Sequence, residues 1–279
     1  MWSLKLPNQS AGDVFSICIS RVRNKDFAQR LAAAKPAIEA ASIQLDQAAR
    51  TNALHTIPTH DIVAPDITQK EMEGVYTGRM ASKAGPGRNI YDEIFTSAPQ
   101  GRCPLCMQRI VATLDHHLPK TSYPALAVAP LNLIPCCTDC NRAKLSNTPT
   151  VAEDAPLHPY YDNLGDDIWL TATVLELQPT ALKYFVTRSE AWDDTLYARV
   201  NNHFESLSLA ALFASQAADE LMNIRYQLHT YLKTDSAVAV RAELQRRLQS
   251  STAVRRNSWR TAAFRAWSES DWFCNGGFL

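Results

Sequence analysis

Four of the seven cysteines form two pairs whose spacing suits metal binding. Cys103 and Cys106 make one C-x-x-C pair, Cys137 and Cys140 make a second, and thirty residues separate the pairs. Two such pairs supply the four thiolates of a closed tetrahedral zinc site. Because four protein ligands leave no open position for a substrate, we expect a structural Zn²⁺ that joins the two ends of the intervening segment.

Alternative roles for the cysteines fit their spacing less well. Cys136 stands beside Cys137 and competes with it as a ligand, but only Cys137 keeps the two-residue gap to Cys140. An odd number of cysteines in a chain with no secretory signal favours metal binding over disulfides. A redox pair is disfavoured because neither C-x-x-C opens a βαβ pattern. Four buried cysteines without a metal remain the simplest alternative.

The segment between the two pairs carries residues suited to phosphodiester hydrolysis. Asp115 offers a hard oxygen ligand for Mg²⁺, and the adjacent His116 offers a base whose ordinary pKa is near 6.5. Asn141 adds a neutral oxygen ligand, which leaves most of the metal's coordination shell to water and phosphate. Arg142 and Lys144 follow closely and can meet a polyanionic backbone. Such a site can polarise a phosphate while the imidazole deprotonates water.

This pattern resembles a known enzyme family. Asp115-His116, Asn132 and Asn141, interleaved with the C-x-x-C pairs, are similar to the zinc-stapled branch of the HNH (His-Asn-His, ββα-metal) endonucleases. The resemblance implies a strand that ends at Asp115-His116, a loop carrying Asn132, and a helix opened by Asn141. It covers about 45 residues, from Arg102 onward.

The resemblance also implies a role for each residue. His116 is the general base that activates water, and Asp115 and Asn141 hold one catalytic Mg²⁺ or Mn²⁺. Asn132 holds the loop that carries His116 through backbone hydrogen bonds. The residues implied in contact with phosphate are Lys120, Arg142 and Lys144. Asn141 stands where the family name has His, a variant of Mg²⁺-dependent members that weakens any expectation of a softer catalytic metal.

The implied function is that of a metal-dependent HNH endonuclease hydrolysing DNA. The flanking segments resemble bacterial HNH proteins of anti-phage defence or restriction, which implies an ATPase partner of the ABC type, since the chain has no Walker motif of its own. A non-catalytic zinc protein that binds DNA or serves as an adaptor stays open as the alternative. A zinc deaminase does not fit, because an H-x-E motif is missing: Leu118 and Pro119 stand two places after His116 and His117.

The remaining histidines have simpler roles. We interpret His117 as a packing or hydrogen-bonding residue, because neighbours in a strand face opposite sides. His158, in the segment His158-Pro-Tyr-Tyr-Asp162, is interpreted as a capping residue, although its position in the sequence lets it approach the metal. His55 and His60 are interpreted as loop histidines.

The pattern of the whole chain predicts a mainly helical α+β protein in three regions. Residues 1–100 form an N-terminal helical region, residues 101–150 the zinc-stapled ββα-metal core, and residues 151–279 a C-terminal hairpin and helical region. The predicted hairpin pairs Ile168–Leu177 with Leu182–Thr187. Helices are predicted at the following ranges: Val14–Val22, Phe27–Ala34, Ala37–Leu54, Thr68–Met80, Arg88–Phe95, Leu207–Leu232, Ser236–Leu248 and Val254–Trp267.

The balance of charge is neutral overall and uneven along the chain. Lys and Arg number 28, as do Asp and Glu, and no segment reads as a signal peptide or a membrane span, so we expect a soluble cytoplasmic protein. Residues 241–265 nevertheless carry seven Arg against Glu243, a candidate track for the DNA backbone. Because one metal site cuts one strand per event, cleavage of both strands predicts a homo-oligomer or a partner complex.

Overall fold

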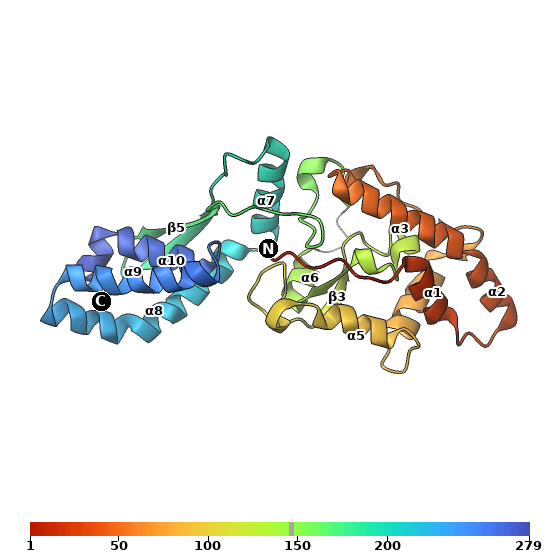
Figure 1. Cartoon of the computed structure of the whole chain (residues 1–279), viewed down its shortest axis with the longest axis horizontal. Coiled ribbons are helices and arrows are strands. Elements are labelled where there is room, and N and C mark those ends of the chain that lie inside the picture. The colour runs from red at the N-terminus through yellow and green to blue at the C-terminus, as the bar shows by residue number, and fades with distance from the viewer. Residues whose placement is uncertain (145–147) are drawn as a thin grey trace. The chain divides into compact units, whose positions relative to one another are not determined.

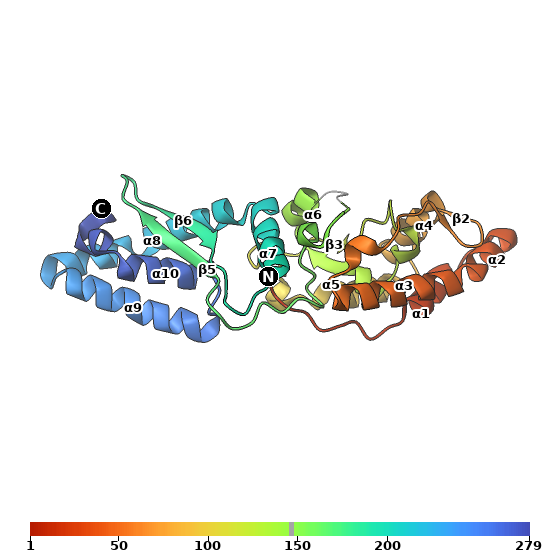
Figure 2. The ribbon, with the colours of Figure 1, turned by 90° about the horizontal axis from the view of Figure 1, so that it is seen from above.

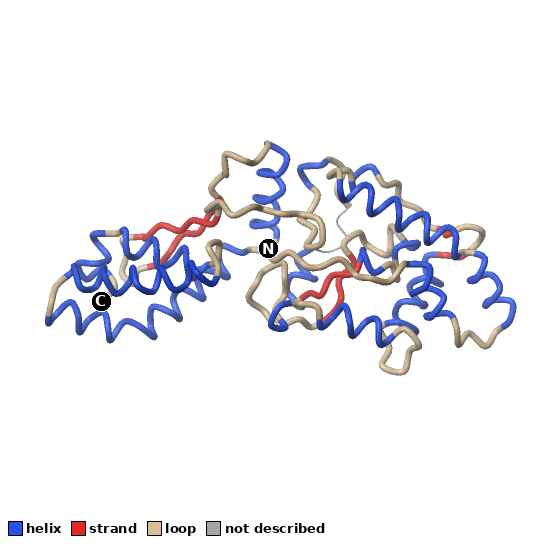
Figure 3. The backbone as a smooth tube through the Cα atoms, viewed as in Figure 1, coloured by secondary structure: helices blue, strands red, loops and turns tan. Residues whose placement is uncertain are grey.

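The computed structural model describes residues 1–144 and 148–279 and contains two compact units, Met1–Asn163 and Leu164–Leu279. The described residues are mainly helical, with three separate two-stranded antiparallel sheets (Figure 3). This confirms the predicted α+β class. In the same residues, no helix combines the length and apolar character required to cross a membrane.

Three helices open the first unit (Figure 1): α1 (Ala11–Ile19), α2 (Lys25–Ala33) and α3 (Lys35–Arg50). α1 begins where it does because the Ser10 side chain accepts a hydrogen bond from the backbone N–H of Asp13. Asn24 caps α2 in the same way, through the N–H of Phe27. Pro36 lies in the first turn of α3, where a missing N–H leaves no hydrogen bond unmade.

The chain then forms a short 3₁₀ turn (Leu54–Thr56), the two-residue strands β1 (Ile62–Val63) and β2 (Ile67–Thr68), and α4 (Gln69–Val75). A capping box between Thr68 and Glu71 starts α4, which runs directly into the π-helical segment η2 (Tyr76–Met80). The predicted helix from Thr68 to Met80 is therefore present, but its last five residues, Tyr76–Met80, form a π-helix and not an α-helix. α5 (Arg88–Thr96) follows a loop.

The segment that carries the candidate site folds as two strands and a helix. β3 (Thr113–His116) and β4 (Leu133–Cys136) pair antiparallel, with Thr113 opposite Cys136 and His116 opposite Leu133. α6 (Thr138–Lys144) starts two residues after β4. Three 3₁₀ turns, each beginning at a proline, complete the segment: Pro99–Gly101, Pro124–Leu126 and Pro130–Asn132. Leu114 and Leu133 join the same buried core as the helices α1–α5.

The second unit combines a hairpin with four helices. β5 (Leu170–Leu175) and β6 (Ala181–Val186) form the hairpin, and α7 (Asp194–Ser206), α8 (Leu209–Thr234), α9 (Ala237–Val254) and α10 (Trp259–Glu269) follow. α10 packs on β5 and α8 on β6 (Figure 2). The sequence pattern predicts one helix from Val254 to Trp267. In the structure, Val254 ends α9, and α10 begins at Trp259 because Ser258 caps it. A 3₁₀ turn (Ala152–Asp154) belongs to the first unit and a π-helical turn (Phe273–Gly277) ends the second.

The units do not follow the three regions expected from the sequence. Residues 1–100 and the described part of 101–150 share one hydrophobic core, because β3, β4 and the loop between them bury Leu114, Leu118 and Leu133 among the helices. The unit boundary lies at Asn163, after the His158–Asp162 segment, and not at residue 150. Residues 145–147 of the predicted central region lie outside the described residues.

Candidate functional site

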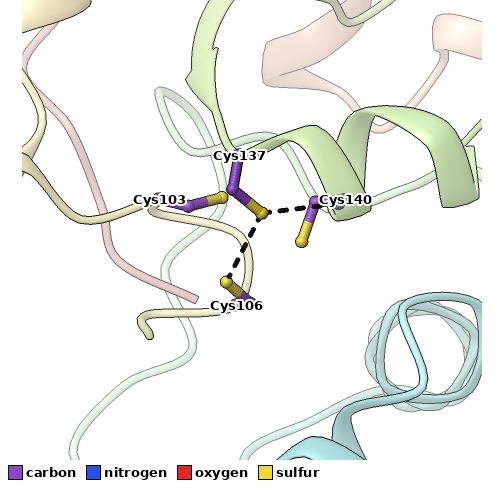
Figure 4. Close-up of side chains that lie close together, drawn as sticks. All are labelled: Cys103, Cys106, Cys137 and Cys140. Carbon is purple, nitrogen blue, oxygen red and sulfur yellow. Dashed lines mark hydrogen bonds between the residues drawn. The ribbon is translucent and has the colours of Figure 1, made fainter. Parts of the chain in front are cut away.

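The two C-x-x-C pairs meet in space. The sulfur atoms of Cys103, Cys106, Cys137 and Cys140 all lie within 4.8 Å of one another, and all four residues are buried (Figure 4). The Sγ atoms of Cys106 and Cys137 are 3.9 Å apart. Tetrahedral Zn–S bonds of about 2.3 Å put sulfur atoms about 3.8 Å apart. The cluster therefore fits a structural metal such as zinc.

The backbone and a surface ion pair organise the cysteine cluster. The N–H groups of Arg109 and Cys140 donate to the sulfurs of Cys106 and Cys137, at 3.5 and 3.4 Å. The Arg109 guanidinium lies 2.6 Å from the carboxylate of Asp139, which stands between the two cysteines of the second pair. Hydrogen bonding with Cys103 lowers the pKa of Cys106 to about 7, so its thiolate, the metal-binding form, is accessible near neutral pH.

Cys136 lies beside the cluster without belonging to it. Its sulfur is 4.0 Å from that of Cys103, and it occupies the last position of β4. Hydrogen bonding with Cys103 and Cys137, together with burial, raises the pKa of the Cys136 thiol. The mutually close set includes Cys137 and not Cys136, which agrees with the two-residue gap between Cys137 and Cys140.

Asp115 is held by a lysine. The Lys144 ammonium lies 2.8 Å from Oδ2 of Asp115 and also donates to the backbone carbonyl of His116. The two side chains are only 9% and 11% exposed. α6 is thereby tied to the end of β3, and a positive charge sits on the carboxylate that the sequence assigned to a metal.

The side chain of His116 is buried and has two neighbours, a backbone carbonyl and an aromatic ring. Its Nε2 is 2.8 Å from the carbonyl oxygen of Ala127, and the Tyr76 ring meets it edge-on with centroids 4.4 Å apart. Burial lowers the pKa of His116 to about 3, an effect that the charges of Lys120 and Lys144 reinforce. The imidazole is therefore neutral at pH 7. Because a carbonyl only accepts, Nε2 carries the proton and Nδ1 carries the lone pair.

Asn132 ties together the loop after β3. Its Oδ1 accepts from the backbone N–H of Leu118 at 2.7 Å, and its Nδ2 donates to the carbonyls of Leu118 and Leu126 at 2.9 and 3.3 Å. Its own carbonyl accepts from the N–H of His117 at 2.8 Å. The side chain is fully buried. These bonds are the ones that the HNH resemblance implies for this residue; its part in catalysis stays a prediction.

His117 and His158 lie on the other side of the same loop. Their rings are 4.0 Å apart between centroids, and both side chains are buried. His158 accepts at Nδ1 from the N–H of Tyr160 and contacts the carbonyl of Leu131 through Nε2 at 3.1 Å. The hydroxyl of Tyr160 donates to the carbonyl of Leu133 at 2.9 Å. The segment that begins at His158 thus contacts the backbone on both sides of Asn132, and the roles interpreted for the two histidines stay predictions.

The other predicted site residues lie nearby with fewer contacts. Asn141 is half-buried on α6, one turn before Lys144, which puts it on the helix face that turns toward β3. Arg142 is exposed on α6. Lys120 is half-buried in the loop after β3, close enough for its charge to lower the pKa of His116.

Comparisons with known proteins leave the family open. No family model matches the chain, and no solved structure matches it. The chain is similar to protein ea31 of Escherichia phage lambda, with 27% identity over 183 residues. The match covers 64% of this chain and 62% of ea31, so the chain spans less than two thirds of that relative's length.

Two contacts of the site carried no signal in the sequence. Tyr76 packs on His116 from 40 residues away, and its hydroxyl donates to the carbonyl of Leu114 at 3.3 Å. His60, interpreted as a loop histidine, accepts at Nε2 from the N–H of Ala125 in the loop after β3, at 3.4 Å. Neither residue stands at a diagnostic spacing from the site, so only the three-dimensional fold reveals them.

Most arginines of the predicted C-terminal track are engaged within the second unit. Arg246 and Arg247 bind the carboxylate of Glu243. Arg241 pairs with Asp271 and Arg260 with Glu220, and Arg256 donates to the carbonyl of Asp166. Three carboxylates, those of Glu243, Asp271 and Glu220, thus compensate part of the charge of the seven arginines in residues 241–265.

We predict that the purified protein carries about one zinc per chain, and that the variants Cys136→Ser and Cys137→Ser differ in their zinc content. Cys136→Ser should keep the metal. Cys137→Ser should lose it and unfold the first unit, because a structural zinc contributes roughly 10–16 kcal/mol in small domains, as much as the whole stability of many proteins. Elemental analysis of both variants measures this. Far less than one zinc in the unaltered protein, or the opposite pattern in the two variants, would contradict the ligand assignment.

We predict that Asn132→Ala exposes the amide of Leu118 to solvent exchange. An unsatisfied buried backbone group costs about 1–3 kcal/mol, and a loss of about 2 kcal/mol makes exchange roughly 30-fold faster. Hydrogen–deuterium exchange of peptides that contain Leu118 measures the effect. Asn89→Ala, at an exposed position of α5, is the matched control and should leave this peptide unchanged. Equal exchange in the two variants would show that Asn132 does not hold the loop.

Proposed function

We propose that this chain is a metal-dependent endonuclease of the HNH kind that hydrolyses phosphodiester bonds of DNA. The observation that carries the proposal is the β3–β4–α6 arrangement, in which Asp115 and His116 end β3 and Lys144 of α6 contacts both, with Asn141 one turn earlier on the same helix. The hydrogen bonds of Asn132 and the cysteine cluster support it, because Asn132 orders the loop after His116 while the cluster brings the start of α6 next to the chain that leads into β3.

The residues around Asp115 fit a hard divalent cation. The Lys144 ammonium on its carboxylate marks a place that already accommodates a positive charge. With the amide oxygen of Asn141, Asp115 offers the oxygen donors that Mg²⁺ and Mn²⁺ prefer. When bound there, the cation would polarise the phosphate and stabilise the leaving oxygen.

The chain's own residues supply the remaining chemistry. The neutral His116, with Nε2 bonded to the Ala127 carbonyl, takes a proton from water at Nδ1. The water oxygen forms a bond to phosphorus while the bond from phosphorus to the leaving deoxyribose oxygen breaks, and that oxygen is protonated by solvent. Tyr76 holds the ring in place, and Arg142 and Lys120 attract the phosphate backbone.

We further propose that the protein acts in anti-phage defence in the bacterial cytoplasm, with an ATP-hydrolysing partner. The likeness of its flanking segments to defence-associated HNH proteins supports this setting. Cutting both strands would take two copies of the site, which favours a homo-oligomer. The genes that neighbour this one and the mass of the protein in solution are the direct tests.

We predict that the protein nicks supercoiled plasmid when Mg²⁺ is present and that His116→Ala slows nicking at least about 100-fold, the usual contribution of a general base. Gel conversion of supercoiled to open-circular plasmid measures the rate. His229→Ala, on α8 in the second unit, is the matched control and should nick normally. Omitting Mg²⁺ is preferable to adding a chelator, because a chelator also removes zinc.

Equal nicking by the unaltered protein and His116→Ala would overturn the enzyme assignment. As a control, the zinc content of the unaltered protein and of His116→Ala should be measured, because equal zinc in the two shows that the cysteine cluster is intact. A protein that binds DNA without cutting it would then be the better description.

A further inference from the structure

A surface hollow of about 340 Å³ lies in the first unit, away from the residues of the candidate site. Its walls come from the residues after α1, from α4 and η2, and from the loop before α5. Arg21, Arg79 and Ser82 supply its polar side chains, and Gly74, Gly78 and Gly85 supply much of its backbone surface. Among the described residues, no carboxylate lines it.

The two arginines of the hollow have no carboxylate partner among the described residues. Four other arginines of the first unit are paired: Arg30 with Glu71, Arg50 with Asp46, Arg88 with Asp92 and Arg109 with Asp139. Within residues 1–144 and 148–279, Arg21 and Arg79 take part in no ion pair. Two uncompensated guanidiniums in one concavity concentrate positive potential there and attract an anion.

The floor of the hollow is bare backbone. Gly74 and Gly78 are one helical turn apart, and a Cβ atom at either position would meet nothing within 4 Å. Gly85 is required for another reason, since its Cβ would lie 2.3 Å from the carbonyl oxygen of Arg79. The N–H of Gly87 donates to that same carbonyl at 2.9 Å. The loop therefore packs tightly on η2, which fixes the backbone from which Arg79 projects.

Guanidinium groups, a hydroxyl and glycine backbone that permits close approach together suit a phosphoryl group. We infer that this hollow binds a phosphate of the DNA backbone at a distance from the bond that is cut. η2 links the two places, because its first residue, Tyr76, packs on His116 while Arg79 and Gly78 face the hollow. The identity of the ligand as DNA rests on the proposed function, whereas the anion site rests on the hollow alone.

The test is binding of a fluorescein-labelled 20-base-pair DNA duplex to the zinc-loaded full-length protein without Mg²⁺, followed by anisotropy. The double variant Arg21→Gln/Arg79→Gln should bind at least about tenfold more weakly in 0.1 M salt. The slope of log affinity against log salt concentration should also become less steep by about one phosphate contact. The matched control, Lys35→Gln/Arg50→Gln, removes the same charge from α3, where both cations are already paired on the surface.

A second variant tests the hollow without removing any cation. Gly78→Glu places a carboxylate into open space and should weaken duplex binding as much as the double variant. The inference is overturned if both variants bind within twofold of the control pair, or if the unaltered protein does not bind the duplex. The inference is also overturned if ATP displaces the duplex from the unaltered protein but not from Arg21→Gln/Arg79→Gln. The ligand of the hollow is then a free nucleotide.

These outcomes are separate from the outcome of the nuclease test. Loss of nicking in His116→Ala concerns the candidate site, while duplex affinity concerns the hollow. A protein that binds DNA through the hollow but nicks no plasmid would contradict the proposed function and leave the phosphate site in place.

Discussion

The position of α6 against β3 depends on the cysteine cluster more than on the helix itself. α6 has seven residues, and helices shorter than about 12 residues are marginal on their own. Cys137 immediately precedes the helix and Cys140 lies in its first turn, next to the loop of Cys103 and Cys106, with the four sulfurs within 4.8 Å. A metal bound there ties the start of the helix to the chain that leads into β3. Asp115, His116 and Asn132 lie between the two cysteine pairs in the sequence, and Asn141 follows on α6.

The Asp115–Lys144 pair gives the site a second constraint. Both side chains are about nine-tenths buried, and removing one partner of such a pair leaves a buried charge without compensation. Under the proposed function, a divalent cation would compensate the carboxylate in place of the ammonium, and Lys144 would then be available to contact a phosphate. The exchange would remove the hydrogen bond from Lys144 to the His116 carbonyl and move one of the charges that lower the pKa of His116, while the contacts of the ring with Ala127 and Tyr76 would remain.

Short-range patterns predicted much of this structure. The cysteine spacing identified the four clustered thiols. The resemblance implied a strand that ends at Asp115-His116, which is present as β3, but it also implied that Asn141 opens the helix, whereas α6 begins at Thr138. A single capping residue such as Ser258 is a weak signal inside a helical pattern, so the boundary between α9 and α10 was predicted wrongly. Contacts between distant residues could not be predicted, because nothing local marks them. Tyr76 on His116 and the grip of His158 beside Asn132 depend on how the helices and the hairpin share one core.

Anomalous X-ray diffraction from crystals of the zinc-loaded protein soaked in Mn²⁺ can locate both proposed metals. We expect a zinc peak among the four cysteine sulfurs and a separate manganese peak within about 2.0–2.3 Å of the oxygens of Asp115 and Asn141. We also expect that the Lys144 ammonium has moved off the carboxylate. A zinc peak with no manganese peak, and Lys144 still bound to Asp115 at saturating Mn²⁺, would contradict a catalytic metal at this site.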